Sequence, residues 1–413
     1  MVRPSHITLS LVCSALMCCQ APRAELVARP TAHDAPPLAT TRPAPPPPPL
    51  GSVGSRMFVP ERSARSLAIF DLESRRVLPE RLKRIGATDA ASLAFSPDLE
   101  RGYVLSSDGK LSEFELATLR VTRSLRLEAN ARELTLSRDG TTLALADHDG
   151  RMLVLVDIRT LSVQARIPTA DATVVRILAL PEQFACVLAG PARVWLLERR
   201  PADAAFTVIS MLNAPEDPRD ALLTGDDHQL LLAHGPDFSR LSVLELARHE
   251  AGFRRLELEP ARSQERPTDA TQSATWAWVA GKLFVTQPRS KRLAVLDPGR
   301  LRRIASLALP GTPGSLAHSP SGRELWLTLD EAGARSRVQV IDAHTLALGR
   351  SFELPARVAH ISFASYGPFA LASAERDDEI LLIHTRSHAL LARESLRAPA
   401  RAQGPWRALR AEL

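Results

Sequence analysis

Two histidines carry the clearest potential chemistry of this sequence. His318 and His360 lie within short strand-like segments, Ser315–Ser319 and Val358–Phe363. An imidazole that faces an interior channel can bind a metal ion, the iron of a tetrapyrrole or an anionic group. The alternative for both residues is an ordinary hydrogen-bonded histidine of the protein interior. The sequence therefore offers two candidate ligand-binding imidazoles and leaves their role open.

Other groups of reactive side chains have simpler explanations. The run Asp147–Gly150 resembles a metal site, but it lies between two apolar segments where Asp-Gly favours a hairpin turn, and the same holds for Asp226–His228. Cys186 lies in an apolar run, which predicts a buried, inert thiol. The sequence contains no Cys-x-x-Cys-His motif, so it predicts no covalently attached haem c and no metal site.

Trp276 and Trp278 alternate at the spacing of a strand, which places both side chains on one face. Such a pair can belong to the core or the wall of a channel, or it can form a shelf on which a flat ligand stacks. The first reading is the simpler one, because strands of this composition are usually buried on one face.

The strands that must position these residues follow a repeat. An apolar run closed by an acidic or polar residue and a turn recurs eight times, at intervals of about 41 to 52 residues, which is close to the period of four-stranded propeller blades. The eight copies are Leu67–Leu72, Phe114–Leu119, Val154–Leu161, Val194–Glu198, Val243–Leu246, Ala294–Asp297, Val340–Leu346 and Leu382–Thr385. The sequence thus predicts an all-β, eight-bladed β-propeller over residues 56–413, with seven blades as the alternative. The first copy lacks an innermost strand, so we expect the C-terminal segment Trp406–Leu413 to close the ring.

The N-terminal region has the features of an export signal. An apolar segment, Ile7–Met17, follows a weakly basic start, and Leu16 lies three residues before Cys19, as in a bacterial lipobox. We therefore expect a signal peptide over residues 1–19 with lipidation at Cys19. Residues 20–55 are rich in proline and are expected to form an extended, disordered tether. This organisation predicts a periplasmic or outer-membrane-anchored protein that touches the membrane only through its lipid.

The overall charge argues against a nucleic-acid partner. The net charge is +6 over 413 residues, and no block of five or more like charges concentrates it. The hydrophobic share of 45% is sufficient for a large core.

The order of these segments resembles NirF-type haem d1 biosynthesis proteins and the haem d1-binding propeller domains of cytochrome-type nitrite reductases. The likeness covers nearly the whole propeller. It is carried by Ser92–Asp98, Asp108–Leu111, Arg219–Thr224, Trp276–Phe284, Leu325–Leu327 followed by Val338–Asp342, and His360–Phe363. The resemblance implies a protein that binds or handles haem d1, a precursor or a related tetrapyrrole in haem d1 biosynthesis, without covalent attachment. It also implies His360 beside the metal, and we expect Arg219 and Arg357 to meet the carboxylates of the tetrapyrrole.

The sequence departs from the family pattern at several positions. Ala90 stands where the family has a histidine, Ser107 where it has an arginine, and Arg219 where it has a tyrosine, while Pro310–Pro313 replaces a His-Gly-Gln-Pro segment. These changes keep open an alternative, in which the propeller has lost the tetrapyrrole site and serves as a scaffold for an envelope protein partner. Whether the chain catalyses a reaction also stays open.

Overall fold

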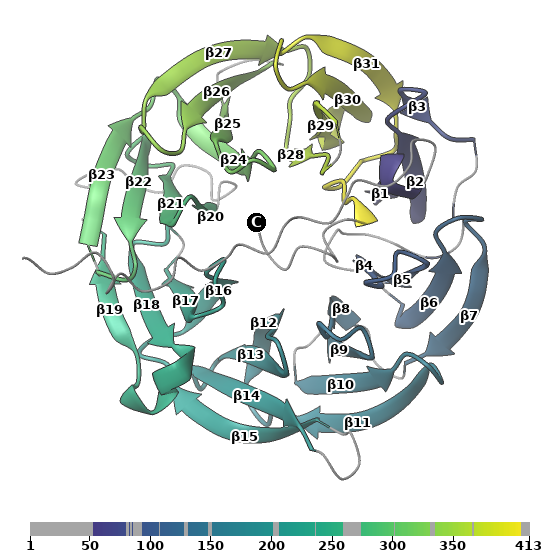
Figure 1. Ribbon diagram of the computed structural model, residues 1–413, viewed down its shortest axis with the longest axis vertical. Coiled ribbons are helices and arrows are strands. Elements are labelled where there is room, and N and C mark those ends of the chain that lie inside the picture. The colour runs from purple at the N-terminus through teal and green to yellow at the C-terminus, as the bar shows by residue number, and fades with distance from the viewer. Residues whose placement is uncertain are drawn as a thin grey trace, which may run out of the picture. The chain divides into compact units, whose positions relative to one another are not determined.

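Short apolar strands separated by turns build a ring of eight sheets (Figure 1). The computed structural model describes residues 53–405 except 80–81, 83–84, 86–92, 107, 128–130, 148–150, 201–205, 236, 259–273, 301, 331–334 and 366. In each of blades 2 to 8 the chain runs from the innermost strand outward, and consecutive strands pair antiparallel. The predicted eight-bladed propeller is confirmed.

The strands of each blade follow the repeat of the sequence. Blade 1 holds β1 (Arg56–Glu61), β2 (Ser66–Asp71) and β3 (Arg76–Val77); blade 2 holds β4 (Leu93–Phe95), β5 (Arg101–Leu105), β6 (Lys110–Glu115) and β7 (Val121–Arg126); blade 3 holds β8 (Ala131–Leu136), β9 (Thr142–Asp147), β10 (Met152–Asp157) and β11 (Ser162–Pro168); blade 4 holds β12 (Thr173–Ala179), β13 (Gln183–Ala189), β14 (Arg193–Arg199) and β15 (Phe206–Asn213). Blade 5 holds β16 (Pro218–Leu223), β17 (Gln229–His234), β18 (Arg240–Glu245) and β19 (Arg254–Glu257); blade 6 holds β20 (Trp276–Val279), β21 (Lys282–Gln287), β22 (Arg292–Asp297) and β23 (Arg302–Ala308); blade 7 holds β24 (Thr312–His318), β25 (Glu324–Asp330), β26 (Ser336–Asp342) and β27 (Leu348–Leu354); blade 8 holds β28 (His360–Phe363), β29 (Phe369–Ala374), β30 (Glu379–His384) and β31 (Leu390–Ser395). The helical segments of the described part are the 3-10 turns η1 (Val53–Ser55), η3 (Leu246–Ala251) and η4 (Glu375–Asp377), and none of them is long and apolar enough to cross a membrane.

Local hydrogen bonds explain why the turns recur. In the hairpin between β8 and β9, the Ser137 hydroxyl donates to Asp139 at 2.6 Å, and the Thr141 N–H donates to the same carboxylate at 3.1 Å. Gly140 completes this turn with a φ of +69°, a conformation that glycine adopts at little cost. Short polar side chains that bond their own backbone are the usual turn formers. Because these contacts join residues that are close in the sequence, the strand boundaries can be predicted from the sequence.

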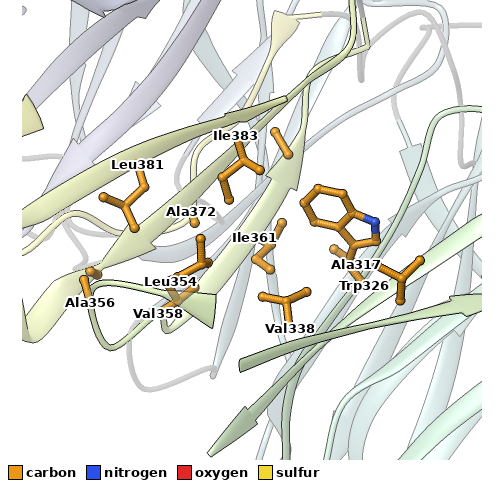
Figure 2. Packing of buried hydrophobic residues seen from close by; sticks show 13 residues of the cluster. Ala317, Trp326, Val338, Leu354, Ala356, Val358, Ile361, Ala372, Leu381 and Ile383 are labelled. Atoms are coloured by element: carbon orange, nitrogen blue, oxygen red, sulfur yellow. The ribbon is translucent and has the colours of Figure 1, made fainter. Parts of the chain in front are cut away.

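The core lies between neighbouring blades rather than inside any one of them. Figure 2 shows one such cluster, in which apolar side chains of blade 7, Trp326 among them, pack against those of blade 8. Trp326 is fully buried, and its ring contacts those of Phe352 and Phe363 at centroid distances of 5.1 and 4.8 Å. Each blade therefore depends on its neighbour to bury its apolar face.

The C-terminal region closes the ring, but through residues that precede the segment expected from the sequence. Phe58 and Gln403 exchange two backbone hydrogen bonds, of 2.7 and 2.8 Å, and the Ala400 N–H donates to the Pro60 carbonyl at 2.9 Å. Residues 399–403 thus take the innermost place in blade 1, beside β1. The pairing residues come just before Trp406–Leu413, the segment expected from the sequence, which lies outside the described residues.

Candidate functional site

The innermost strands of blades 3, 4, 5 and 8 each place one ionisable side chain at the same level of the ring. In every case the residue lies opposite the fifth residue of the second strand of its blade, and these pairs are Glu133 with Ala146, Arg176 with Val187, Asp220 with Ala233, and His360 with Ser373. These strands are the ones that surround the central axis in Figure 1. The ring therefore carries two carboxyl groups, a guanidinium and an imidazole at one depth.

A β-bulge precedes this position in three of the four strands. The register shifts immediately before Glu133 in β8, before Arg176 in β12 and before Asp220 in β16. A bulge inserts one extra residue and re-aims the side chains that follow it. In β16 the extra residue is Arg219, which is exposed. The shared bulge is the local feature that brings the three charged groups of adjacent blades into contact.

Arg176 joins the two carboxyl groups across three blades. Its Nε donates to Asp220 Oδ1 at 3.0 Å, and its Nη2 donates to the same oxygen. Its Nη1 lies 3.6 Å from Glu133 Oε1. Although burial disfavours the cation, Asp220 and Glu133 keep the pKa of Arg176 above its ordinary value. Arg176 is thus held by one close carboxylate and by one more distant carboxyl group.

Asp220 is fixed by two further donors. The Ala221 N–H donates to Oδ1 at 2.9 Å, and the indole Nε1–H of Trp276 donates to Oδ2 at 3.0 Å. The Trp276 ring is held in turn by Phe238, at a centroid distance of 5.2 Å. The carboxylate of Asp220 therefore has a set orientation, and Trp276 acts as part of the wall that supports it.

Glu133 is the less firmly held partner. Burial raises the pKa of Glu133 to about 7. Two neighbours lower this pKa: the cation of Arg176, and the Ile177 N–H, which donates to Oε1 at 3.3 Å. The charge of Asp220 adds to the rise. A carboxyl group with such a pKa can exchange a proton near neutral pH.

The pKa of Glu133 predicts a pH dependence of stability. From pH 4.5 to 7 the unfolded chain releases this proton while the folded chain keeps it, so the free energy of unfolding falls with rising pH, by about 3 kcal/mol in total. The Glu133→Gln variant should lack this loss. We expect it to match the wild type in urea unfolding at pH 4.5 and to exceed it by about 3 kcal/mol at pH 8. Equal stabilities at pH 8 would contradict the assignment.

His360 and Arg357, two of the residues expected in the site, lie together on blade 8. His360 begins β28 and is half-buried, and Arg357 is exposed in the connection just before that strand. The Arg357 N–H donates to Asp377 Oδ2 at 2.6 Å. Arg219, the third expected residue, lies on blade 5 next to Asp220. The structure therefore places the three residues on innermost strands or at their ends, but on two separate blades.

The remaining expectations have mixed outcomes. The predicted turn at Asp226 is present, since Thr224 donates to its carboxylate at 2.6 Å, while most of Asp147–Gly150 lies outside the described residues. Cys186 is fully buried, and burial raises the pKa of its thiol, as expected for an inert group.

Trp278 packs with Trp276 against the same apolar cluster, which confirms their common face. His318 is half-buried, and its Nδ1 lies 3.1 Å from the Ser319 carbonyl oxygen.

Sequence reasoning did not identify Glu133, Arg176 or Asp220 as a connected group. One signal was available: Arg176 interrupts an apolar run that should be buried, Thr173–Ala179. An arginine in such a place is rarely unpaired. Its partners lie about 44 residues away on each side, one blade period in either direction.

A separate pocket of about 340 Å³ lies in blades 3 and 4, at the strand ends away from Glu133 and Arg176. It is lined in part by the turns between β8 and β9 and between β12 and β13. Its arginine is already engaged, because Arg199 lies 3.0 Å from Asp139 and over the ring of Phe206 at 5.0 Å. The central group around Arg176 is therefore the better candidate site.

Comparison with known proteins gives the family. Residues 54–401 match the model of the Cytochrome D1 heme domain. The chain belongs to this family. It is 26% identical to Protein NirF of Stutzerimonas stutzeri over 85% of this chain and 92% of that protein. It is 25% identical to Protein NirF of Pseudomonas aeruginosa over 81% of this chain and 86% of that protein.

A solved structure, "Dihydro-heme d1 dehydrogenase NirN in complex with DHE", has a similar fold. The TM-score is 0.72 at 20% identity, over 90% of this chain and 79% of that one. The family resemblance drawn from the sequence is thus confirmed. Ala90 and Ser107, where the sequence departs from the family pattern, and the expected lipidation residue Cys19 all lie outside the described residues.

Proposed function

We propose that this protein binds haem d1, or a precursor of it, in haem d1 biosynthesis and holds it without a covalent bond. The observation that carries the proposal is the set of arginine, carboxyl and imidazole groups on the innermost strands of a Cytochrome D1 heme domain. The NirF relatives span most of this chain, which supports the same pathway. The scaffold alternative has less support, because these relatives and the NirN structure all point to haem d1 chemistry.

The residues present suit such a ligand. A guanidinium matches a carboxylate through two parallel N–H donors. Three guanidinium groups lie on innermost strands or next to one, those of Arg176, Arg219 and Arg357. His360 supplies an imidazole across the ring from Arg176, on blade 8 against blade 4, and imidazole is a common axial ligand of haem iron. Cys186 is buried and no Cys-x-x-Cys-His motif exists, which favours non-covalent binding.

The proposal includes an envelope location. Residues 1–19 would direct export, Cys19 would carry the lipid, and the proline-rich residues 20–55 would tether the propeller, residues 56–413, to a membrane of the periplasm. A membrane anchor of this kind would keep the protein close to the place where a periplasmic cofactor is assembled.

An absorption titration tests the function. We expect haem d1 to produce a saturable spectral shift with the purified propeller, and ordinary haem b to produce a weaker one. Weak and equal shifts with both would overturn the proposal and favour the scaffold.

His360→Ala should abolish the part of that shift that arises from iron ligation, because it removes the imidazole and leaves the blade intact. His344→Ala is the matched control, since His344 lies in the outer turn between β26 and β27. An unchanged spectrum with His360→Ala would exclude His360 as the ligand.

A further inference from the structure

We propose that Arg176 receives a carboxylate of the ligand, and that Glu133 is its exchangeable partner, which leaves Arg176 and takes up one proton when the ligand binds. This inference rests on the proposed function, since it assumes an anionic ligand at the centre of the ring. It adds a proton to the binding equilibrium and assigns that proton to one residue.

The two partners of Arg176 are held very differently. Asp220 accepts two hydrogen bonds from Arg176 and one each from Ala221 and Trp276, so its removal would break four contacts. Glu133 approaches Arg176 only to 3.6 Å and is otherwise held by the Ile177 N–H at 3.3 Å. An incoming carboxylate would therefore displace Glu133 and leave Asp220 in place.

Arg176 also remains accessible. About a third of its side chain is exposed (36%), against 13% for Glu133 and 21% for Asp220. The long contact, 3.6 Å to Glu133 Oε1, is made by Nη1 of Arg176. A ligand carboxylate can therefore approach the guanidinium at the edge that carries Nη1, in the two-point geometry that arginine favours.

The groups around Glu133 decide its protonation after the exchange. The ionisable groups that act on it are Arg176 from β12, Asp220 from β16 and the buried thiol of Cys186 from β13. When a ligand carboxylate pairs with Arg176, Glu133 loses its cation and gains a second negative neighbour, while the burial that already raises its pKa persists. The carboxylate of Glu133 then binds a proton from solvent, and no bond of the ligand changes.

The experiment is isothermal titration calorimetry with haem d1 at pH 8, in two buffers that differ in ionisation enthalpy. The difference in apparent enthalpy gives the protons taken up. With a pKa of about 7 in the free protein, Glu133 is mostly charged at pH 8, so we expect an uptake of about 0.9 proton per ligand. Binding should also weaken by up to about tenfold per pH unit above 7.

Two variants assign the proton. Glu133→Gln should bind haem d1 with no proton uptake and with a flat pH profile. Asp342→Asn should keep the uptake, because Asp342 lies at the outer turn between β26 and β27, where its carboxylate accepts hydrogen bonds from the N–H groups of His344 and Thr345 at 2.9 and 2.7 Å. Loss of the uptake in Asp342→Asn, or its persistence in Glu133→Gln, would overturn the proposal. So would tight binding by the wild type with no uptake, whereas a failure of haem d1 to bind at all would instead overturn the proposed function.

Discussion

Truncation after Arg397 is expected to unfold the propeller. The removed segment supplies the inner neighbour of β1 through the paired hydrogen bonds of Phe58 with Gln403 and the bond from Ala400 to Pro60. It also accepts a hydrogen bond of 2.8 Å from the buried hydroxyl of Ser373 in blade 8. At about 1 kcal/mol for each hydrogen bond, these contacts stabilise the fold by roughly 4 kcal/mol, before any apolar burial. Because domains are stable by only about 5–15 kcal/mol, the loss should leave the chain largely unfolded or associated through the open edge of β1.

A shorter truncation provides the control. Removal of Trp406–Leu413 leaves every contact named above in place, since the last of them is made by Gln403. This variant should keep the urea midpoint and the elution volume of the full propeller. A large loss of stability in the short truncation would show that Trp406–Leu413 is needed to close the ring. Wild-type stability of the long truncation would show that the ring closes without its C-terminal strand.

The architecture was predictable because its signals are local. Each blade is marked in the sequence by an apolar run, and several blades also by a turn whose carboxylate accepts a hydrogen bond from the backbone two or three residues later, as Asp157 does from Arg159 at 2.7 Å and Thr160 at 3.1 Å. Such contacts depend on neighbouring residues alone, so they can be read from the sequence. Eight regularly spaced copies then indicate a closed ring, because closure removes exposed sheet edges.

The candidate site was only partly predictable, because its contacts are not local. His360 and Trp276 could be placed on innermost strands from their spacing in apolar runs. The contact between Arg176 and Asp220 depends on a β-bulge in each of two strands, and on the distance between adjacent blades. The sequence marks no such bulge, since Val175 and Arg219, the extra residues, are ordinary strand residues. Arg219, expected as a carboxylate ligand, is therefore also the residue that sets the position of Asp220.

The bulges also suggest why this part of the ring suits an exchangeable ion pair. A bulge breaks the ladder locally and gives the following side chain a direction that regular pairing does not allow. In blades 4 and 5 this brings Arg176 close to Asp220, whereas Glu133 of blade 3 stays at 3.6 Å. Buried ion pairs contribute little net stability on average. A firm pair beside a loose one is more readily understood as preparation for an anionic ligand than as a structural support.

The Trp326→Ala variant is expected to lose about 4 kcal/mol of unfolding free energy, the second largest effect that the structure predicts. Trp326 lies between blades 7 and 8 and is fully buried beside aliphatic side chains (Figure 2). The rings of Phe352, Phe363 and His388 also contact it. Truncation to alanine leaves a cavity that these rigid strands cannot collapse to fill, so the lost contacts add to the lost burial. Urea unfolding followed by both fluorescence and circular dichroism measures the loss and reveals whether the blades still unfold together.

Trp326→Phe and Trp195→Phe separate volume from hydrogen bonding. The indole N–H of Trp326 donates to Glu324 Oε2 at 3.3 Å, so phenylalanine removes this hydrogen bond together with part of the ring. Phenylalanine keeps most of the ring contacts with Phe352 and Phe363, so Trp326→Phe should lose far less than the alanine variant. Trp195 is also buried, but within the described part of the chain its indole N–H has no hydrogen-bond partner, so Trp195→Phe should be nearly neutral.

Two outcomes would contradict this account of the packing. If Trp326→Ala lost less than about 1 kcal/mol of unfolding free energy, the interface between blades 7 and 8 would not stabilise the fold as its packing indicates. If the two probes gave separate transitions, the ring would be unfolding blade by blade, as in an open repeat array, rather than as one closed unit.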